Sequence, residues 1–294
     1  LPRCAPIERC VELRCRNTTA RRNVVNFREQ VMEIGKNRKK EASDVIWAAW
    51  QNGYALTEFP KDLFPMTRSE AYRIQLEYAQ RSSKPVFGWK IAATSLAGQQ
   101  HIGVSGPIAG LLLGENIYKS GSKLTIDNNR MAVAEAEFAF SIKQCLRPRT
   151  ALYTENEVID AINKLYLAIE LPNSRFEHFE KVGDLQLIVD NACAHQFILG
   201  DGVDVNWKDI DLAEHKVIIS TKRGTENRGS GANVLDHPIT ALTWLVNELS
   251  KNELPLDKDM IVTTGSCTTP IPIERGDSIL ADFGKLGSVS VEIE

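Results

Sequence analysis

The sequence predicts an α+β fold, and three observations lead to that prediction. Short apolar stretches with strand character alternate irregularly with a few amphipathic helices, whereas a doubly wound sheet would show a regular alternation. The region from residue 260 to residue 293 contains three consecutive strand patterns with no helix between them. The chain has 294 residues, of which 43% are apolar, so it is long enough to bury a sizeable core in one large or two ordinary domains.

The charge balance excludes two classes of partner. The chain has 35 Lys and Arg against 38 Asp and Glu, which gives a formal net charge of −3. Such a chain has no overall basic field that would hold nucleic acid or an anionic membrane. The longest apolar stretches, such as 108–113, are far shorter than the roughly 20 residues of a membrane span. We therefore expect no nucleic-acid partner and no membrane segment.

Residues 1–31 differ in composition from the rest of the chain. They contain seven Arg against three Glu, and they carry three of the six cysteines (Cys4, Cys10 and Cys15) without any apolar periodicity. They lack the apolar run of a secretory signal, and their acidic residues fit an organelle transit peptide poorly. Two interpretations stay open, a disordered leader and an extension that does not belong to the native protein.

The other three cysteines are Cys145, Cys193 and Cys267, and no C-x-x-C pair occurs anywhere in the chain. Because they are odd in number and far apart, we interpret them as small buried apolar residues. A catalytic thiol or a metal site is the weaker interpretation. Cysteines of this kind are typical of a reducing compartment, so the sequence predicts a cytoplasmic protein.

Two helices are predicted in the N-terminal third. One covers 41–52 and ends at Asn52-Gly53, and the other is opened by a capping box of Thr67 and Glu70 and ends before Ser82. Residues 86–131 are rich in Gly and short apolar runs, which are typical of brief strands and functional loops. The apolar faces of the two helices are formed by Val45, Ile46 and Ala49 and by Tyr72, Leu76 and Ala79.

The C-terminal half mixes strands and helices. A strand is predicted over 131–142, with Phe138 and Phe140 on one face. A second capping box, Thr154 with Glu157, predicts a helix whose apolar positions Val158, Ile162, Leu165 and Ile169 recur at helical spacing. A further helix begins at Pro238, and strands follow over 260–264, 278–283 and 288–293, the last two joined by a turn at 284–287. The buried stripe of the helix from Pro238 consists of Ala241, Leu242, Leu245, Val246 and Leu249.

Several common functional motifs are absent from the sequence. Gly229-Ser230-Gly231 lacks the third glycine of a dinucleotide-binding fingerprint, and neither a Walker A loop nor a G-x-S-x-G elbow occurs. The five histidines show no zinc-ligand spacing. Among them only His101 lies in a Gly-rich stretch of the kind that lines functional sites.

Two glutamates stand out because of their surroundings. Glu135 and Glu137 are two residues apart on the predicted strand, so both project from one face with Cα atoms about 7 Å apart. A bare pair of this kind is usually a solvated face, but Ala, Val and Phe flank this one and suit a buried strand. A third acid, Glu170, is the lone charge in the apolar strand pattern 167–172. Buried like charges repel unless a cation lies between them, and carboxylate oxygens suit Mg²⁺ or Mn²⁺.

A series of further motifs follows in order along the chain. They are Gly88-Trp89-Lys90-Ile91, Ala93-Thr94-Ser95, Gln99-Gln100-His101-Ile102-Gly103-Val104, Glu135-Ala136-Glu137, Ala168-Ile169-Glu170, Asn173-Ser174-Arg175, Asp190-Asn191-Ala192, Gly229-Ser230-Gly231-Ala232-Asn233-Val234-Leu235, Leu242-Thr243-Trp244-Leu245, Thr264-Gly265-Ser266-Cys267-Thr268 and Phe283-Gly284-Lys285-Leu286-Gly287-Ser288-Val289. In this order they resemble the fumarylacetoacetate hydrolase superfamily, specifically its 2-keto-4-pentenoate hydratase / 4-oxalocrotonate decarboxylase branch. The resemblance runs from about residue 41 to the C-terminus.

This resemblance implies a fold and a domain organisation. The expected core is a fumarylacetoacetase-like mixed β-roll or sandwich with a small helical N-terminal region. The corresponding division is a leader or non-native extension over 1–31, an N-terminal helical and loop region over 32–115, and the catalytic domain over 116–294.

The resemblance also implies a set of site residues. Glu135, Glu137 and Glu170 match the metal ligands of the family, and Lys90 matches its active-site lysine. Some hydratases of this branch carry an acid just after the proline that corresponds to Pro107, where this chain has Ile108, so His101 or a metal-bound water becomes the candidate for that catalytic role. The loops that match the segments around the substrate's carboxylate contain Gly229 and Ser230 and, further on, Thr264, Gly265 and Ser266.

Members of the branch act on short 2-oxo or 2-hydroxydienoic acids, whose carboxylate and C2 oxygen can chelate a divalent cation. The cation stabilises the enolate that develops at C2, and this serves hydration, decarboxylation and hydrolytic C–C cleavage alike. We expect a hydratase that adds water to 2-hydroxypenta-2,4-dienoate. A 4-oxalocrotonate decarboxylase, an acylpyruvate-type hydrolase and a catalytically degenerate partner subunit remain the alternatives. The resemblance also implies a homo-oligomer and an association with the decarboxylase or hydratase of the same pathway.

Overall fold

The computed structural model describes residues 18–294, and the side chains of residues 35–294. Contacts divide the chain into a short unit, Leu1–Arg38, and a large unit, Lys39–Glu294. The helices are α1 (Thr18–Asn52), α2 (Arg68–Ala79), α3 (Leu96–Ile102), α4 (Glu155–Ala161), α5 (Phe179–Val182), α6 (Asp184–Val189) and α7 (Pro238–Lys251). The strands are β1 (Val86–Ala92), β2 (Ile108–Leu113), β3 (Ile117–Lys119), β4 (Ser122–Leu124), β5 (Val133–Ile142), β6 (Ile162–Leu171), β7 (Gln196–Gly202), β8 (Lys216–Thr221), β9 (Glu226–Ser230), β10 (Ile261–Ser266), β11 (Ile271–Pro272), β12 (Ser278–Asp282) and β13 (Ser288–Ile293).

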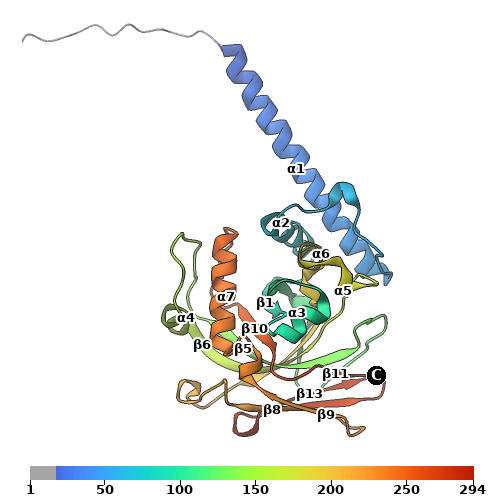
Figure 1. Cartoon of the computed structure of the whole chain (residues 1–294), viewed down its shortest axis with the longest axis vertical. Coiled ribbons are helices and arrows are strands. Elements are labelled where there is room, and N and C mark those ends of the chain that lie inside the picture. Colours follow the sequence, from blue (N-terminus) through green and yellow to red (C-terminus); the bar gives the residue numbers. More distant parts are fainter. Residues whose placement is uncertain (1–17) are drawn as a thin grey trace, which may run out of the picture. The chain divides into compact units, whose positions relative to one another are not determined.

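The large unit is built on two sheets (Figure 1). The described part of the first has eight strands in the order β2-β1-β10-β5-β6-β7-β3, with β11 paired to β5. The second has five strands in the order β4-β13-β12-β8-β9. Residues of β13 contact β6 and β7, and Phe283 after β12 lies against Phe138 of β5 with ring centroids 5.2 Å apart. The predicted α+β class and the sandwich-like core are therefore confirmed.

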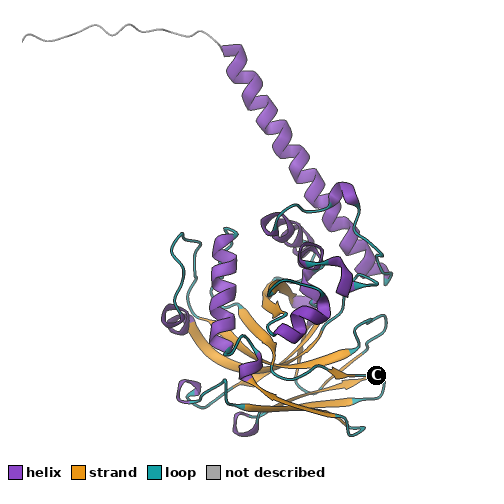
Figure 2. Cartoon of the chain, in the orientation of Figure 1, coloured by secondary structure: helices purple, strands orange, loops and turns teal. Residues whose placement is uncertain are grey.

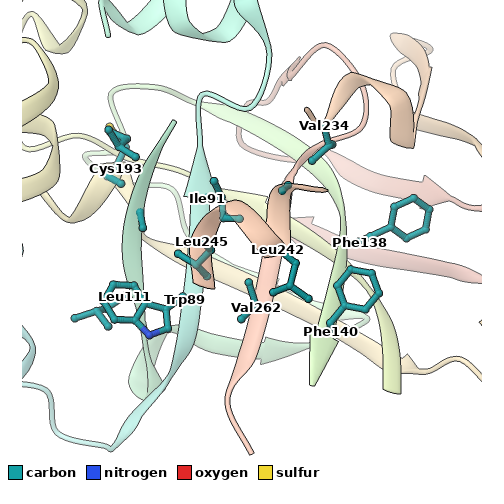
Figure 3. Packing of buried hydrophobic residues seen from close by; sticks show 14 of the residues in the cluster. Trp89, Ile91, Leu111, Phe138, Phe140, Cys193, Val234, Leu242, Leu245 and Val262 are labelled. Carbon is teal, nitrogen blue, oxygen red and sulfur yellow. The ribbon is translucent and has the colours of Figure 1, made fainter. Parts of the chain in front are cut away.

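The helices of the large unit gather on one side of the strands (Figure 2). Helix α7 is the longest helix that lies wholly in this unit, and it begins at Pro238 as predicted. The ring of His237, just before it, accepts a hydrogen bond from the N–H of Ile239 at 3.0 Å. Its predicted stripe is buried throughout, and Leu242 and Leu245 lie beside Val262 of β10 (Figure 3). Burial of this stripe is what fixes the helix on the sheet, since apolar area removed from water is the main source of stability.

Both predicted capping boxes mark real helix starts. At α4 the reciprocal pair of Thr154 and Glu157 is complete. At α2 the Thr67 hydroxyl accepts the N–H of Glu70 at 3.1 Å, while the Glu70 carboxylate accepts the N–H of Met66 at 2.9 Å. The α2 helix ends at Ala79, ahead of Ser82, as the sequence predicts.

The prediction that helical spacing continues from Val158 to Ile169 is wrong. Helix α4 ends at Ala161, and Ile162 begins β6, which pairs with β5 on one side and β7 on the other. At the start of β6 a register shift against β5 leaves Ile162 and Leu165 buried three residues apart, and from Leu167 on every position is buried, so these apolar residues also fit a helical period. Pairing along both edges of β6 decides in favour of the strand, which includes the apolar stretch predicted around Glu170.

Helix α1 ends at Asn52 as predicted, but it begins at Thr18 and not near residue 41. Within the large unit, Ala42, Ile46 and Ala49 of this helix are buried. Residues 1–17, with Cys4, Cys10 and Cys15, lie outside the described residues. The predicted boundary after residue 115 falls between β2 and β3 of the first sheet. The assignment of 1–31 to a leader and the division into 32–115 and 116–294 stay predictions.

The prediction that Cys145, Cys193 and Cys267 are small buried residues is confirmed for two of the three. Cys193 and Cys267 are buried free thiols, whereas Cys145 is half-buried with its sulfur 3.4 Å from Asp257 Oδ1. In the described part of the chain, no helix combines the length and the apolar character that crossing a membrane requires.

Candidate metal centre

The three predicted carboxylates meet on one face of the first sheet. Glu135 on β5 lies directly opposite Glu170 on β6 in the strand register, and Glu137 is two residues further along β5. Because side chains two apart on a strand share a face, all three project to the same side. One oxygen from each carboxylate lies within 4.8 Å of one oxygen from each of the others. The cluster of Glu135, Glu137 and Glu170 is called the carboxylate triad below.

The triad contains buried oxygens that lack a partner. Glu137 and Glu170 are fully buried, and Glu135 is half-buried. Glu137 Oε1 and Glu170 Oε2 accept no hydrogen bond from any residue in the part of the chain that the structure describes. A buried carboxylate oxygen without a donor is costly, so these two oxygens favour an additional positive partner.

Lys90 on β1 is the basic side chain that contacts the triad. Its Nζ lies 3.1 Å from Glu170 Oε1 and donates a hydrogen bond of 3.1 Å to the carbonyl of Ala192. Lys90 is almost fully buried. With the triad ionised and Lys90 protonated, the cluster carries a net charge of −2, which one divalent cation neutralises. Three hard oxygen ligands and this charge fit Mg²⁺ or Mn²⁺.

Burial raises the pKa of every carboxyl group in the triad. For Glu137, the like charges of Glu170 and Glu135 raise the pKa further, well above its usual range. Lys90 lowers the pKa of Glu135 and Glu170, but burial outweighs it, and the pKa of Glu170 is raised to about 7. Burial lowers the pKa of Lys90, yet the three carboxylates together raise it more, so Lys90 remains an ammonium group at neutral pH.

Two residues on β10, the strand paired with β5, hold Glu137 in place. The hydroxyl of Thr263 and the backbone N–H of Gly265, both on β10, donate hydrogen bonds to Glu137 Oε2, the second at 3.1 Å. The other oxygen, Oε1, is thereby left for a ligand. Sequence reasoning missed Thr263, because a threonine in a strand is ordinary and its partner lies 126 residues away.

His101 lies in the last turn of α3, exposed, with its ring against Phe179 at a centroid distance of 6.0 Å. Ile108, which follows Pro107, is fully buried at the start of β2 and pairs with Ala92. Ile108 therefore offers no polar group, and the catalytic role of His101 stays a prediction.

The predicted substrate loops pack against each other. A Cβ on Gly229 would lie 2.0 Å from the carbonyl oxygen of Cys267, so only glycine permits this approach. Several of their polar groups already have partners within the protein: the Thr264 hydroxyl donates to the Phe138 carbonyl at 3.0 Å, and the Ser266 hydroxyl to the Thr268 carbonyl at 2.8 Å. The Ser230 hydroxyl accepts the N–H of Ala232 at 3.3 Å. Their role in substrate binding, together with that of Gly265, stays a prediction.

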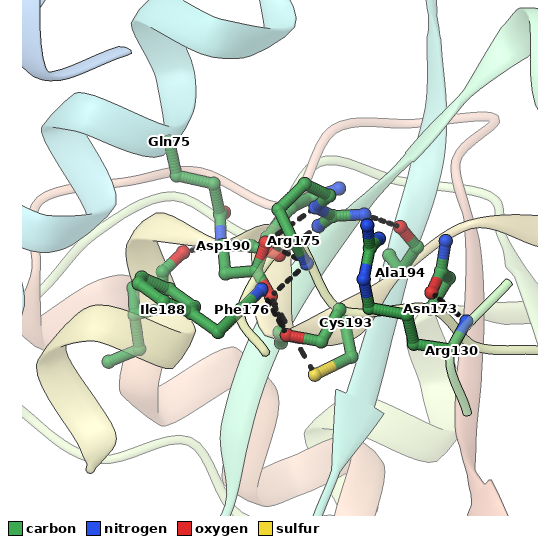
Figure 4. Close-up of polar contacts among 12 residues, drawn as sticks. Gln75, Arg130, Asn173, Arg175, Phe176, Ile188, Asp190, Cys193 and Ala194 are labelled. Carbon is green, nitrogen blue, oxygen red and sulfur yellow. Dashed lines mark hydrogen bonds and ion pairs between the residues drawn. The ribbon is translucent and has the colours of Figure 1, made fainter. Parts of the chain in front are cut away.

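A buried ion pair braces the chain beside the triad. Arg175, four residues after β6, is fully buried and donates through Nε to Asp190, whose carboxylate also accepts the Ser174 hydroxyl at 2.6 Å (Figure 4). Arg175 Nη1 donates to the Ala194 carbonyl at 3.0 Å. These bonds tie the end of β6 to the segment that carries the carbonyl next to Lys90.

We expect Arg175→Met to destabilise the protein by about 3–5 kcal/mol, because it leaves the Asp190 carboxylate buried and unpaired. The free energy of unfolding in urea measures this. Lys123→Met is the control, since Lys123 pairs with Glu292 at 3.0 Å on the exposed surface, and that substitution should leave the urea midpoint unchanged. Equal midpoints for Arg175→Met and the native protein would show that the buried pair has no bracing role.

Comparison with known proteins identifies the family. No family model matches the sequence. The 2-oxo-hept-4-ene-1,7-dioate hydratase of Escherichia coli is 30% identical over 236 residues, which cover 76% of this chain and 86% of that enzyme. The chain belongs to the 2-keto-4-pentenoate hydratase / 4-oxalocrotonate decarboxylase family. The 2-keto-4-pentenoate hydratase of Paraburkholderia xenovorans is 26% identical over 87% of this chain and 95% of its own length.

A solved structure of the same family has the same fold. The 4-oxalocrotonate decarboxylase of Pseudomonas putida G7, complexed with magnesium and adipate, matches with a TM-score of 0.79 and 27% identity over 88% of this chain and 98% of that one. The resemblance to this branch of the fumarylacetoacetate hydrolase superfamily is therefore confirmed. Both activities that were predicted for the chain, hydratase and decarboxylase, occur among the named members of its family.

Proposed function

We propose that the chain is a metal-dependent hydratase that adds water to 2-hydroxypenta-2,4-dienoate, giving 4-hydroxy-2-oxopentanoate in the meta-cleavage degradation of aromatic compounds. The observation that carries this proposal is the buried carboxylate triad with unpartnered oxygens beside the Lys90 ammonium. A scaffold protein has no reason to keep three acids and a lysine together in its interior, because their desolvation is costly.

Glu135, Glu137 and Glu170 would hold Mg²⁺ or Mn²⁺. When bound, such an ion supplies Lewis-acid stabilisation of the negative charge that develops on the C2 oxygen of the substrate. The orientation of Glu137 favours this role, since Thr263 and Gly265 occupy Oε2 and leave Oε1 turned to the cluster. Magnesium in the related decarboxylase of Pseudomonas putida G7 supports the same choice of ion.

Hydration of the dienol needs two carbon protonations and one water. Ketonisation moves the proton of the C2 hydroxyl to C5 and leaves a C3–C4 double bond conjugated to the C2 carbonyl. Water then adds at C4, loses one proton, and C3 gains one. Lys90, as an ammonium group, either pairs with the substrate carboxylate or donates and recovers a proton within the site.

His101 is the group we assign to the attacking water. Some hydratases of the branch are expected to carry an acid where this chain has the buried Ile108, so we assign a different base. His101 is exposed in the last turn of α3, where it can exchange a proton with solvent and accept one from water. The loops with Gly229, Ser230, Thr264, Gly265 and Ser266 are proposed to line the carboxylate end of the substrate.

A second candidate function is decarboxylation of 4-oxalocrotonate (2-oxo-3-hexenedioate). It is favoured by the fold match of 0.79 in TM-score to a named 4-oxalocrotonate decarboxylase and by a relative of that name that is 28% identical over 90% of this chain. Both reactions stabilise negative charge at C2, so the same triad serves either. A homo-oligomer and an association with the partner enzyme of the pathway are further proposals of this assignment.

The experiment is an assay of the purified chain with each substrate, in Mg²⁺ and in EDTA. A hydratase removes the ultraviolet absorbance of 2-hydroxypenta-2,4-dienoate in Mg²⁺ and is inactive in EDTA. Release of carbon dioxide from 2-oxo-3-hexenedioate would instead assign the decarboxylase. If the protein binds Mg²⁺ but turns over neither compound, the hydratase proposal is wrong, and the hydrolase and partner-subunit alternatives remain.

A further inference from the structure

Next to Lys90 the backbone adopts a conformation that L-amino acids avoid. Asn191, Ala192 and Cys193 follow one another with φ values of 56°, 49° and 59°, and none of them is glycine. A left-handed conformation at one such residue is uncommon, and three in a row persist only where the surrounding structure imposes them. We call residues 191–193 the left-handed turn.

The left-handed turn presents a carbonyl to the buried lysine. The oxygen of Ala192 accepts a hydrogen bond of 3.1 Å from Lys90 Nζ, and Glu170 Oε1 lies 3.1 Å from the same nitrogen. An ammonium group has three N–H donors, so these two partners fix its rotation. The direction of the third N–H donor is then fixed as well. Glu135 and Glu137 are the other carboxylates that raise the pKa of Lys90.

One side chain holds this turn against the sheet. Asn191 Oδ1 accepts the N–H of Leu111 at 2.6 Å, and its Nδ2 donates to the carbonyl of Leu111 at 2.8 Å. Leu111 lies on β2, the strand beside β1, directly opposite the neighbour of Lys90. The amide therefore makes the two hydrogen bonds that a further strand would make at this edge.

Gly110, the residue before Leu111 on β2, also lies against the left-handed turn. Gly110 is the residue paired with Lys90, and a Cβ there would lie 2.2 Å from the carbonyl oxygen of Asn191. The close approach of the left-handed turn to β2 thus depends on glycine on one side and on the Asn191 amide on the other.

We propose that Asn191 is a positioning residue for Lys90: by anchoring the left-handed turn to β2, it places the Ala192 carbonyl that orients the lysine ammonium toward the substrate. This inference rests on the proposed function, and within it on Lys90 as the group that donates and recovers a proton. Asn191 itself touches neither the triad nor the reacting atoms. Its removal should therefore lower kcat while leaving the KM for substrate and the Kd for Mg²⁺ unchanged.

The test compares Asn191→Ala with Gln75→Ala. Gln75 is a matched control, since its buried amide donates 2.9 Å hydrogen bonds to Ala109 of β2 and to Ile188 of α6 (Figure 4) without contacting the left-handed turn. Asn191→Ala should lower kcat by about 10- to 100-fold, the usual consequence of a misplaced catalytic group. Gln75→Ala should lower the melting temperature while its folded fraction keeps the native kcat.

A second measurement does not depend on turnover. Acetic anhydride labelling of Lys90, quantified by mass spectrometry, should rise several-fold in Asn191→Ala and stay at the native level in Gln75→Ala. Native kcat and native labelling in Asn191→Ala, or equal losses of kcat in both variants, would overturn the proposal. If the native protein turns over neither substrate, the proposed function fails, and the labelling alone decides the role of Asn191.

If Asn191→Ala does not fold, Asn191→Asp carries the test. It keeps the shape and the acceptor for the N–H of Leu111 but loses the donor to the Leu111 carbonyl. We expect a fall in kcat and a rise in the labelling of Lys90 relative to the native protein. Native values of both would contradict the positioning role.

Discussion

Glu137→Gln should abolish the metal-dependent activity, with kcat/KM at least ~1,000-fold lower, and leave the fold intact. The substitution keeps the volume of the side chain but removes the charge of a carboxylate whose partners, Thr263 and Gly265, already orient it toward the cluster. In the metal-free protein the variant should be as stable as the native chain or more so, because burial and like charges raise the pKa of Glu137. Steady-state kinetics and thermal unfolding in EDTA measure the two effects.

The matched control for this variant is Glu292→Gln. Glu292 lies on β13 with an exposed side chain whose partner is Lys123, so the same chemical change there should alter neither activity nor Mg²⁺ affinity. Turnover of Glu137→Gln within a few-fold of the native protein would remove Glu137 from the ligand set. A loss of activity accompanied by unfolding would point to a packing role instead.

Lys90→Met should lower kcat by about 100- to 10,000-fold, the range for removal of a group that takes part in proton transfer. Because Lys90 is a cation 3.1 Å from Glu170, its removal should leave the affinity for Mg²⁺ equal or higher. The metal-free variant should be less stable than the native protein, since the buried carboxylates lose the charge that opposes them. Kinetics, titration calorimetry with Mg²⁺ and thermal unfolding separate these three effects.

Lys164→Met on β6, the strand that carries Glu170, is the control for Lys90→Met. Its ammonium pairs with the exposed Asp204 at 3.3 Å and lies outside the triad, so its kinetics should be native. If Lys90→Met binds Mg²⁺ as weakly as Glu137→Gln does, then Lys90 acts by shaping the ligand set and not on the substrate.

The central acids could be predicted from the sequence because they break a simple pattern. Glu135 and Glu137 share a face by strand periodicity, and Glu170 is the lone charge in an apolar strand, so their convergence needed only the pairing of β5 with β6. The helix from Pro238 and the three C-terminal strands follow from equally local signals, and the structure confirms them.

Features that depend on strand register, or on hydrogen bonds between residues far apart in the sequence, could not be predicted. At the start of β6 a register shift against β5 interrupts the strand alternation, so the buried Ile162 and Leu165 are three residues apart, as in a helix. Thr263 and Asn191 are ordinary residue types whose roles arise only when another strand comes within hydrogen-bond distance. Thr264 and Ser266 were predicted to line the substrate's carboxylate. Only the structure reveals that their hydroxyls donate to backbone carbonyls.

The central claim is that the carboxylate triad binds a divalent cation inside the protein. The most direct measurement is anomalous diffraction from a crystal of the native chain soaked with Mn²⁺. We expect an anomalous peak with one oxygen each of Glu135, Glu137 and Glu170 at roughly 2.0–2.3 Å, as is typical of hard divalent ions. A Mn²⁺ peak elsewhere, with the three carboxylates uncoordinated, would contradict it.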